Sequence, residues 1–358
     1  WYYDPPTKIS IACWIRQWNI YTPKYMNRGQ IDRLMKCFSE QSAGGLPRLI
    51  ETHISWVIMA GGFAYKIKKP IRYNFLDFST REKREFYCER EVMLNRRLTE
   101  DVYLGVVPVR LADGCCFIGG MQGEIIDHAV KMKEMPSHRR MDLLLKEDKV
   151  SYLHIGRLAE KIAGFHQRAE IIPGKDIMDI PLKFADLANE REFLSRHLSV
   201  GADIEWAVHA SLSFMERHWE LVSTRQQEGL IRDCHGDLHT RNIFLLEAPQ
   251  PFDCIEFNND LRQIDVLNEV AFLCMDLDAL GRRELAALFL IRYNELFPVM
   301  RTKEEEKLFL YFESYRANVR AKVNSYRARS ATTPEERDAA LGEAEKYLWL
   351  MKEYLEQL

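Results

Sequence analysis

The sequence lacks any long apolar stretch and any marked excess of one charge. No run approaches the roughly 18 consecutive apolar residues that a membrane-spanning helix needs, which predicts a soluble protein. The 50 basic and 53 acidic side chains give a net charge of −3, whereas a dedicated nucleic-acid-binding protein is usually strongly basic. We therefore expect neither a membrane nor a nucleic acid among its partners.

Regularly spaced cysteines and glycine-rich phosphate-binding motifs are missing too. The eight cysteines form no C-x-x-C pair and no zinc-ligand spacing. Scattered thiols are typical of the reducing cytosol, so we expect a cytoplasmic protein without a disulfide framework. Neither G-x-G-x-x-G nor G-x-x-x-x-G-K-[ST] occurs, which excludes a P-loop ATPase domain from these 358 residues.

The first 29 residues differ from the rest, because they hold seven aromatic side chains and begin at Trp1. One interpretation is that the natural protein starts at Met26 and that the preceding residues are an upstream extension. The alternative is an aromatic docking arm. The segment has no uninterrupted apolar stretch that ends in a small-residue cleavage site, so a secretory signal peptide is not expected.

The apolar pattern of the first third predicts strands and one helix. Residues 53–69 are predicted to form a hairpin, because an apolar, β-branched run meets the turn Gly61-Gly62 and a returning strand follows. Residues 80–98 are predicted to form a helix that Ser79 caps, with Glu82 completing a capping box. Further expected elements are short strands at 106–111 and 115–119 and a connector at 130–136.

After the connector, helical periodicity dominates. Apolar residues between Ile155 and His166 fall on one helical stripe, where His166 is interpreted as a core histidine. Residues 184–224 and the chain after Asp265 are predicted helical, with a break at 332–334. The pattern predicts an α+β fold with two lobes, a small β-rich N-terminal lobe and a larger helical C-terminal lobe. The expected segments are an extension and lead-in helix at 1–45, the N-terminal lobe at 46–131 and the C-terminal lobe at 132–358.

The densest polar cluster is the segment 235–242, His-Gly-Asp-Leu-His-Thr-Arg-Asn. Two strands are expected after it, and an antiparallel pairing centred on residue 249 would place Asn242 opposite Glu256. Two oxygen ligands at that separation suit Mg²⁺. Asp237, on the loop, is suited to accept a proton from a substrate hydroxyl. The alternative is that Asp237 and Asn242 only cap turns.

A lysine for phosphate is predicted on the hairpin of the N-terminal lobe. Lys66 and Lys68 share one face of the strand-like segment, by the period of two. Glu91 falls within an otherwise apolar stripe of the helix at 80–98, where a carboxylate is costly without a cation. We expect a Lys66–Glu91 pair, with Lys68 as the runner-up, and the alternative is a solvated edge strand.

Together these motifs resemble the aminoglycoside phosphotransferase-like branch of the protein-kinase-like superfamily. The pattern His-Gly-Asp-x-x-x-x-Asn is specific for the superfamily. The chain is similar, more narrowly, to the bacterial "aminoglycoside phosphotransferase family enzyme" group, whose members are often fused to a P-loop ATPase domain. The two segments typical of that group are Ala64-Tyr-Lys-Ile-Lys-Lys-Pro70 and Tyr315-Arg-Ala-Asn-Val-Arg-Ala-Lys322.

The resemblance implies a role for each polar residue of the predicted site. Asp237 would be the catalytic base on a loop braced by His235, and Asn242 and Glu256 would hold Mg²⁺. Lys66 with Glu91 would clamp the phosphates of ATP. The resemblance also places Met132 in the connector that receives adenine, and makes Asp265 a structural tie between the loop and the following helix.

We accordingly expect an ATP- and Mg²⁺-dependent phosphotransferase that acts on a hydroxyl of a small molecule, aminosugar-like or another metabolite. Ten acidic side chains against three arginines in 231–281 favour a cationic acceptor. Arg316, Arg320 and Lys322 are expected on a solvated helix face.

Two alternatives use the same residues differently. The first is a pseudokinase-like nucleotide-binding module that acts with a P-loop ATPase, either a partner or a missing fused domain. It is favoured because Glu256 stands where the superfamily has Asp, and because no glycine-rich loop precedes the first hairpin. The second, a kinase of protein substrates, is weaker because no activation-loop segment follows Glu256.

Overall fold

The computed structural model describes residues 26–41, 46–73, 76–177 and 179–358. The interpretation of the aromatic N-terminal segment falls mainly on residues outside these ranges. Within them, none of the helices has the length and apolarity that crossing a membrane would require.

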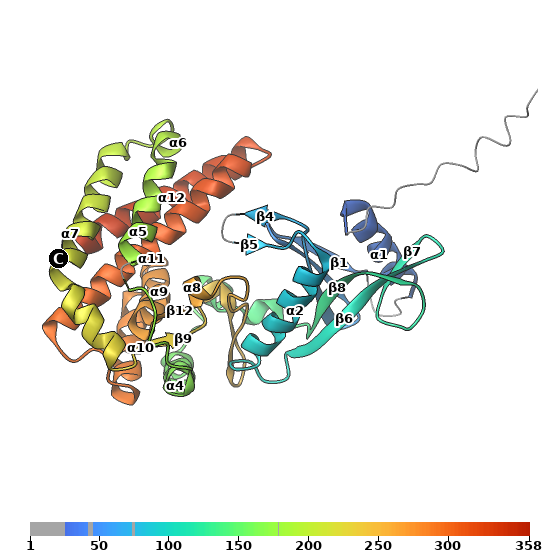
Figure 1. Cartoon of the computed structure of the whole chain (residues 1–358), viewed down its shortest axis with the longest axis horizontal. Helices are drawn as coiled ribbons and strands as arrows, with labels where there is room; N and C mark the ends of the chain where they lie inside the picture. The colour runs from blue at the N-terminus through green and yellow to red at the C-terminus, as the bar shows by residue number, and fades with distance from the viewer. Residues whose placement is uncertain (1–25, 42–45, 74–75, 178) are drawn as a thin grey trace, which may run out of the picture.

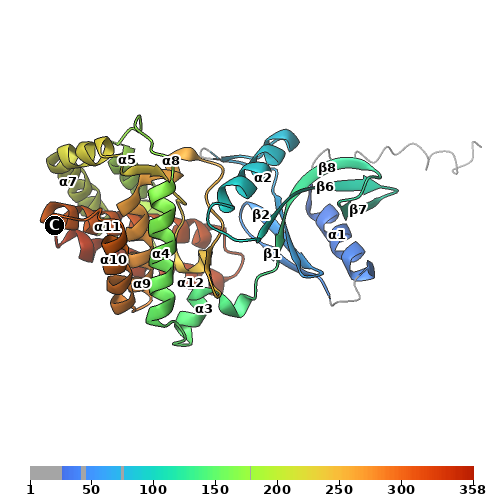
Figure 2. The same cartoon turned by 90° about the horizontal axis from the view of Figure 1, so that it is seen from below.

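The N-terminal lobe is built on one antiparallel sheet with the strand order β1-β2-β3-β8-β6-β7 (Figures 1 and 2). A separate two-stranded pair, β4 (Arg72–Tyr73) and β5 (Leu76–Asp77), lies beside it. The strands of the main sheet are β1 (Arg48–Glu51), β2 (Ser55–Ala60), β3 (Phe63–Lys68), β6 (Tyr103–Ala112), β7 (Cys115–Ile118) and β8 (Glu124–Lys133).

The predicted hairpin at 53–69 is confirmed as β2 and β3, which pair from Ser55–Lys68 to Ala60–Phe63. Gly61 and Gly62 form its turn with φ of 58° and 78°, values that favour glycine. β8 was not predicted as a strand, and its last four residues were assigned to the connector. It is a central strand with helices on both faces, so the five consecutive residues from Ile126 to Val130 are buried and the alternating pattern disappears.

Two helices cover opposite faces of the sheet, as Figure 2 shows. α1 (Arg28–Gln41) packs its apolar residues with Trp56, Ile58 and Ile67, so the lead-in helix shares a core with the sheet. α2 (Arg81–Asn95) packs against β6 and β8. The cap of α2 is Thr80 rather than Ser79, since Thr80 Oγ1 accepts a hydrogen bond from the Lys83 N–H while Ser79 Oγ donates to Asp77.

The C-terminal lobe is helical and has one large core, in which α9 (Val266–Ala279) is buried along its whole length up to Leu277. The predicted helical region at 184–224 is divided into several helices. The other long helices are α4 (Tyr152–Arg168), α7 (Gly201–Gln227), α10 (Arg283–Leu296), α11 (Lys303–Ser330) and α12 (Pro334–Leu355). The short helices are α3 (Met141–Lys146), α5 (Asp179–Ala185), α6 (Arg191–Ser195) and α8 (Asn259–Arg262), with 3₁₀ turns at Ser137–Arg139, Asp186–Glu190 and Thr240–Asn242. Its short strands are β9 (Ile231–Asp233), β10 (Ile243–Leu245), β11 (Pro249–Pro251) and β12 (Gln263–Asp265).

The expectation of a solvated basic face on α11 is wrong. Arg316 and Arg320 are only 4% and 8% exposed, and Lys322 is half-buried with its Nζ donating to the Lys183 carbonyl. The reason is that α11 packs against both α9 and α12, so it has no broad solvent-facing side.

The predicted register of the hairpin after the polar segment 235–242 is also wrong. β10 and β11 pair Ile243 with Pro251 and Leu245 with Pro249, so the hairpin is centred on residue 247. Asn242 therefore meets Phe252, whose N–H donates to the Asn242 carbonyl at 2.9 Å, and not Glu256. Pro249 and Pro251 favoured a loop in the sequence. Residues two apart in a strand have their backbone nitrogens on the same side, so both prolines, which lack an N–H, face the free edge of β11, where proline is tolerated.

A buried ion pair joins three helices of the C-terminal lobe. The Arg225 guanidinium of α7 donates to both oxygens of Asp265 at 2.7 and 2.8 Å and to Glu305 of α11 at 2.8 Å. Asp265 also caps α9 by accepting from the Leu267 N–H. All three side chains are at most 1% exposed, so none is solvated by water.

Replacing Arg225 with Met is expected to lower the free energy of unfolding by about 3–5 kcal/mol, because it leaves the buried Asp265 carboxylate without its cation and Glu305 with Arg301 alone. Chemical denaturation measures this loss. The matched control is Arg217→Met on the exposed face of the same helix, which should stay close to wild type. Equal losses in both variants would contradict the assignment.

Candidate active site

The predicted catalytic loop, residues 235–242, follows β9 and ends in the 3₁₀ turn before β10. This loop brings Asp237 and Asn242 into contact: Asn242 Nδ2 donates to Asp237 Oδ2 at 2.9 Å and to its carbonyl oxygen at 3.1 Å. His239 Nε2 lies 3.4 Å from the same Oδ2. The Asp237 side chain remains 37% exposed, so it is held in place and still accessible.

The Asp237 carboxylate is ionised at neutral pH. Burial raises its pKa, but the nearby His239, His235 and Arg320 outweigh that effect and hold the pKa well below its ordinary value. An ionised, positioned carboxylate can accept the hydrogen bond of a substrate hydroxyl and orient its oxygen.

His235 is buried and bonded at both ring nitrogens. Its Nδ1 accepts from the Asp237 N–H at 3.2 Å, and its Nε2 lies 2.9 Å from the Phe252 carbonyl. The first contact requires an unprotonated Nδ1, so Nε2 carries the hydrogen and donates it. Burial lowers the His235 pKa, which agrees with a neutral ring. The ring thus joins the catalytic loop to the strand end at Phe252.

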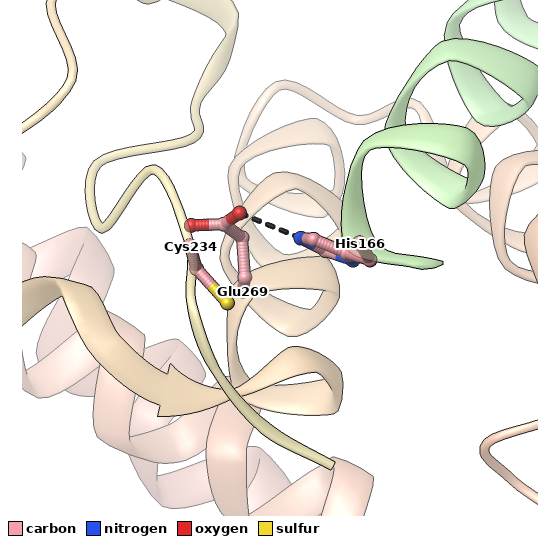
Figure 3. A group of neighbouring side chains, drawn as sticks. All are labelled: His166, Cys234 and Glu269. Carbon is pink, nitrogen blue, oxygen red and sulfur yellow. Dashed lines mark hydrogen bonds and ion pairs between the residues drawn. The ribbon is translucent and has the colours of Figure 1, made fainter. Parts of the chain in front are cut away.

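Glu269, on α9, holds the backbone at the start of this loop, and the sequence analysis did not identify it. Its carboxylate accepts from the His235 N–H at 2.8 and 3.0 Å and from the Gly236 N–H at 2.5 Å. His166 Nε2 donates to Glu269 Oε2 at 2.8 Å (Figure 3). The other ring nitrogen bonds Tyr293 Oη at 2.7 Å. His166 is thus a fully bonded core histidine, as expected.

His166, Cys234 and Glu269 are close enough together to resemble a metal site (Figure 3). The hydrogen bonds speak against that use. The Glu269 oxygens already accept from the His235 and Gly236 N–H groups and from His166, and the other ring nitrogen of His166 bonds Tyr293. Burial raises the pKa of the Cys234 thiol well above its ordinary value, so it stays protonated. We interpret this cluster as a support of the catalytic loop.

Gly236 is required by the same packing. Its φ is 87°, and a Cβ there would lie 2.8 Å from the Leu261 carbonyl oxygen. No other residue could bring its N–H to Glu269 in this conformation without displacing the backbone of α8.

The two lysines of β3 point to one face of the sheet and share one glutamate. Lys66 Nζ lies 2.8 Å from Glu91 Oε1, and Lys68 Nζ lies 2.6 Å from Glu91 Oε2. Burial raises the Glu91 pKa, but the two ammonium groups outweigh it and bring the pKa to about 2. The predicted Lys66–Glu91 contact is therefore present, and Lys68 joins it.

Each lysine also reaches an acid of the C-terminal lobe. Lys66 Nζ contacts Asp253 Oδ1 at 2.5 Å, and Lys68 Nζ forms a short contact with Glu256. Glu256 is 3% exposed, whereas Asp253 is 43% exposed. The structure thus places Glu256 against Lys68, away from the ladder position opposite Asn242 that the sequence predicted.

Asp253 is the second site residue that the sequence analysis did not identify. It follows Phe252, the residue that bonds Asn242, and has a φ of 65°. Its N–H donates to Tyr103 Oη at 3.2 Å. The only signal in the sequence was its position next to the hairpin, and the wrong register concealed it. Carboxylate and amide oxygens from Asp253 and Asn242 suit a hard cation such as Mg²⁺.

Met132 lies on β8 and not in the connector. It pairs with Ala64 and Tyr103 across the sheet and belongs to a buried apolar cluster on the face that carries Lys66. Phe252 of the C-terminal lobe packs against the same cluster. The turn Gly61-Gly62 lies at this end of the hairpin, since the Gly62 carbonyl accepts from the Glu134 N–H at 2.9 Å.

Replacing Glu269 with Gln is expected to loosen the catalytic loop, because an amide offers one acceptor oxygen where the carboxylate offers two. Burial raises the Glu269 pKa, but His166, His235 and the loop N–H groups bring it to about 2, below the ordinary 4.5. The wild-type advantage in unfolding free energy should therefore be complete above about pH 5 and shrink as the pH falls towards 2.

Denaturation at several pH values measures this advantage, and hydrogen exchange of the Gly236 amide reports on the loop itself. Glu284→Gln, an exposed change on α10, is the control and should alter neither quantity. A pH-independent difference would contradict a role for the carboxylate charge.

Comparison with known proteins gives relatives of unassigned function and solved structures with a shared fold. No family model matches the chain. Uncharacterized proteins of Mycobacterium tuberculosis and Mycobacterium bovis are 32% identical over 314 residues, which is 86% of this chain. The chain spans only 59% of the length of those relatives.

Among solved structures, a choline kinase of Cryptosporidium parvum has a TM-score of 0.53 at 11% identity, covering 87% of this chain and 90% of its own. A choline/ethanolamine kinase family protein of Mesorhizobium loti has a TM-score of 0.51 at 12% identity, with 89% and 98% covered. Aminoglycoside 2′-phosphotransferase-IIIa, in a GDP complex, also has a TM-score of 0.51, at 13% identity, with 89% and 97% covered. The likeness confirms the expected fold: the chain has the two-lobed, protein-kinase-like α+β fold of choline kinases and aminoglycoside phosphotransferases.

Proposed function

We propose that this protein transfers the γ-phosphoryl group of ATP, with Mg²⁺, to a hydroxyl of a small molecule. The observation that carries the proposal is the convergence of Lys66 and Glu91 from one lobe with Asp253 from the other, beside Phe252, which bonds Asn242. A cation, a metal-binding acid and a positioned carboxylate at Asp237 are the parts that phosphoryl transfer requires.

Each residue has a distinct task in this proposal. Lys66, kept in place by Glu91, offers its ammonium to the phosphates. Its pKa is lowered by burial, but Asp253 and Glu91 raise it well above the ordinary value, so it stays charged. Asp237 accepts a hydrogen bond from the hydroxyl of the acceptor. It thereby aligns the hydroxyl oxygen with the γ-phosphorus bond of ATP that breaks.

The donor set at the metal position fits Mg²⁺. Asp253 is the more exposed of the acids that contact Lys66 and Lys68. The Asn242 amide nitrogen donates to Asp237, so the Asn242 amide oxygen can bind a cation. Bound Mg²⁺ would neutralise charge on the phosphate oxygens. We propose Asp253 with Asn242 as the ligands, and Glu256 as the buried counterion of Lys68.

The solved structures of the same fold support the substrate class at a coarse level. They are named for choline, ethanolamine and aminoglycosides, which are small molecules with hydroxyl groups. One of them was solved with GDP, so GTP is tested beside ATP.

ATP with Mg²⁺ is expected to raise the melting temperature of the wild type. A ligand that binds only the folded state stabilises it by about 2.7 kcal/mol at a hundredfold excess over Kd. Lys66→Ala should lose most of this shift, because it removes the phosphate-binding cation. Lys36→Ala on α1, whose side chain is 79% exposed, should retain it. A folded wild type that responds to neither ATP nor GTP would contradict the proposal.

Asp253→Asn is expected to remove the Mg²⁺-dependent part of that shift and to spare the part seen with ATP alone. Asp113→Asn is a matched control, because Asp113 is exposed in a turn and also has a positive φ of 49°, which Asn tolerates. Glu256→Gln tests the other assignment. If Glu256→Gln abolishes the Mg²⁺ dependence while Asp253→Asn preserves it, Glu256 is the ligand and our assignment is wrong.

A further inference from the structure

A cavity of about 90 Å³ opens beside Asp237. α5, β12, α9 and α11 contribute to its lining, together with Asp237 itself and Gly236. A cavity of this volume holds more than one water-sized group, since about 10–15 Å³ suffices for a single water. Because Asp237 orients the acceptor hydroxyl in the proposed function, this cavity is where the rest of the acceptor would lie.

Arg316 of α11 lines this cavity with an unused donor. Its Nε donates to Asn268 Oδ1 at 2.7 Å and its Nη1 to the Gly236 carbonyl at 3.2 Å, and its guanidinium lies 4.7 Å from the Phe272 ring centre. Nη2 has no hydrogen-bond partner, although Arg316 is only 4% exposed. Asn268, fully buried beside it, leaves its Nδ2 without a partner as well.

Arg316 also lacks a counterion. Among the residues that the structure describes, no carboxylate forms an ion pair with it, in contrast to the buried Arg225. A buried guanidinium without an anion is costly. Burial lowers the Arg316 pKa, and the more distant charges of Glu269 and Asp237, which raise it, do not outweigh that effect.

The acids of the cavity are already paired or solvated. Asp179 binds Lys175 and Lys183, Asp260 binds Lys175, and Asp265 is held by the buried arginine of α7. Asp176 is exposed to solvent. The acidic composition of 231–281 therefore does not produce a buried acidic pocket for a cationic acceptor.

We propose that the acceptor is a small hydroxylated anion, whose oxyanion is bound by Arg316 Nη2 and Asn268 Nδ2 while its hydroxyl lies at Asp237. The proposal rests on the proposed function and names its substrate class. The oxyanion and the hydroxyl can belong to one small molecule, because Arg316 bonds the carbonyl of Gly236, the residue directly before Asp237. A guanidinium donor and an amide donor are both suited to bind the oxygens of a carboxylate or a phosphate.

The reaction balances without another reactant. The hydroxyl oxygen forms a bond to the γ-phosphorus as the bond from that phosphorus to the β,γ-bridging oxygen breaks. ADP leaves with the electron pair, and the hydroxyl proton passes to Asp237 and then to water. The product is a phosphate monoester of the hydroxylated anion.

The test compares acceptors that share the glycerol skeleton and differ in one group: glycerate, glycerol 3-phosphate, glycerol and 3-aminopropane-1,2-diol. ADP formation from ATP measures kcat/KM for each. At least one of the two anions is expected to exceed glycerol and the amine by tenfold or more, and the better one shows whether the site takes a carboxylate or a phosphate. The same comparison with gluconate, glucitol and glucamine covers a longer acceptor.

Asn268→Asp is the decisive variant, because a carboxylate of the same size would neutralise Arg316 without leaving a hole. We expect it to reduce the preference for the anion at least tenfold, whereas Asn189→Asp on the exposed surface should preserve it. Arg316→Lys keeps the charge but shortens the reach, and should lower kcat/KM for the anion more than for glycerol.

Three results would overturn the inference: a preference for the amine or the neutral polyol, transfer to none of the anions, or an unchanged preference in Asn268→Asp. Failure of the proposed function is distinguished by the absence of any nucleotide-induced stabilisation of the wild type. A protein that binds ATP with Mg²⁺ and phosphorylates only the amines would keep the function and disprove the substrate class.

Discussion

The catalytic loop takes its shape from hydrogen bonds that its own backbone donates to the buried Glu269 carboxylate. Those bonds hold Gly236 at a positive φ, which favours glycine, and they fix the orientation of the neighbouring Asp237. His166 of α4 donates a hydrogen bond to this glutamate of α9, so two helices of the large core hold the loop. Because the group is buried, the arrangement is specified far more tightly than a solvated turn would be.

The lysines of β3 depend on that loop indirectly. Asp253 and Glu256, which form ion pairs with these lysines, follow the hairpin that starts after Asn242. The C-terminal lobe therefore sets their positions. Two ion pairs thus cross between the lobes on the same face as Glu91. In the proposed function a nucleotide would compete with Asp253 for Lys66, while the buried Lys68–Glu256 pair would maintain the contact between the lobes.

Much of this could be predicted from spacing alone. The β2–β3 hairpin, the stripe of α4 and the Lys66–Glu91 contact follow from local periodicity and from the cost of a buried carboxylate. The hairpin register could not, because Pro249 and Pro251 suggested a loop where the structure has an edge strand. The hairpin centre lies two residues earlier than predicted, so the residue opposite Asn242 is Phe252 and not Glu256, which hid Asp253 and misplaced Glu256.

Buried polar residues on helices were the other source of error. A carboxylate in the apolar helix α9 and a guanidinium on α11 have no local signature, because their partners lie far away in the chain. The sequence by itself determined the lobes, the catalytic segment and the lysine–glutamate pair, since each depends on patterns within one element or its neighbour. Only the tertiary structure decided that Glu269 supports the loop and that Arg316 lines the cavity beside Asp237, because burial and charge compensation arise only when distant helices pack together.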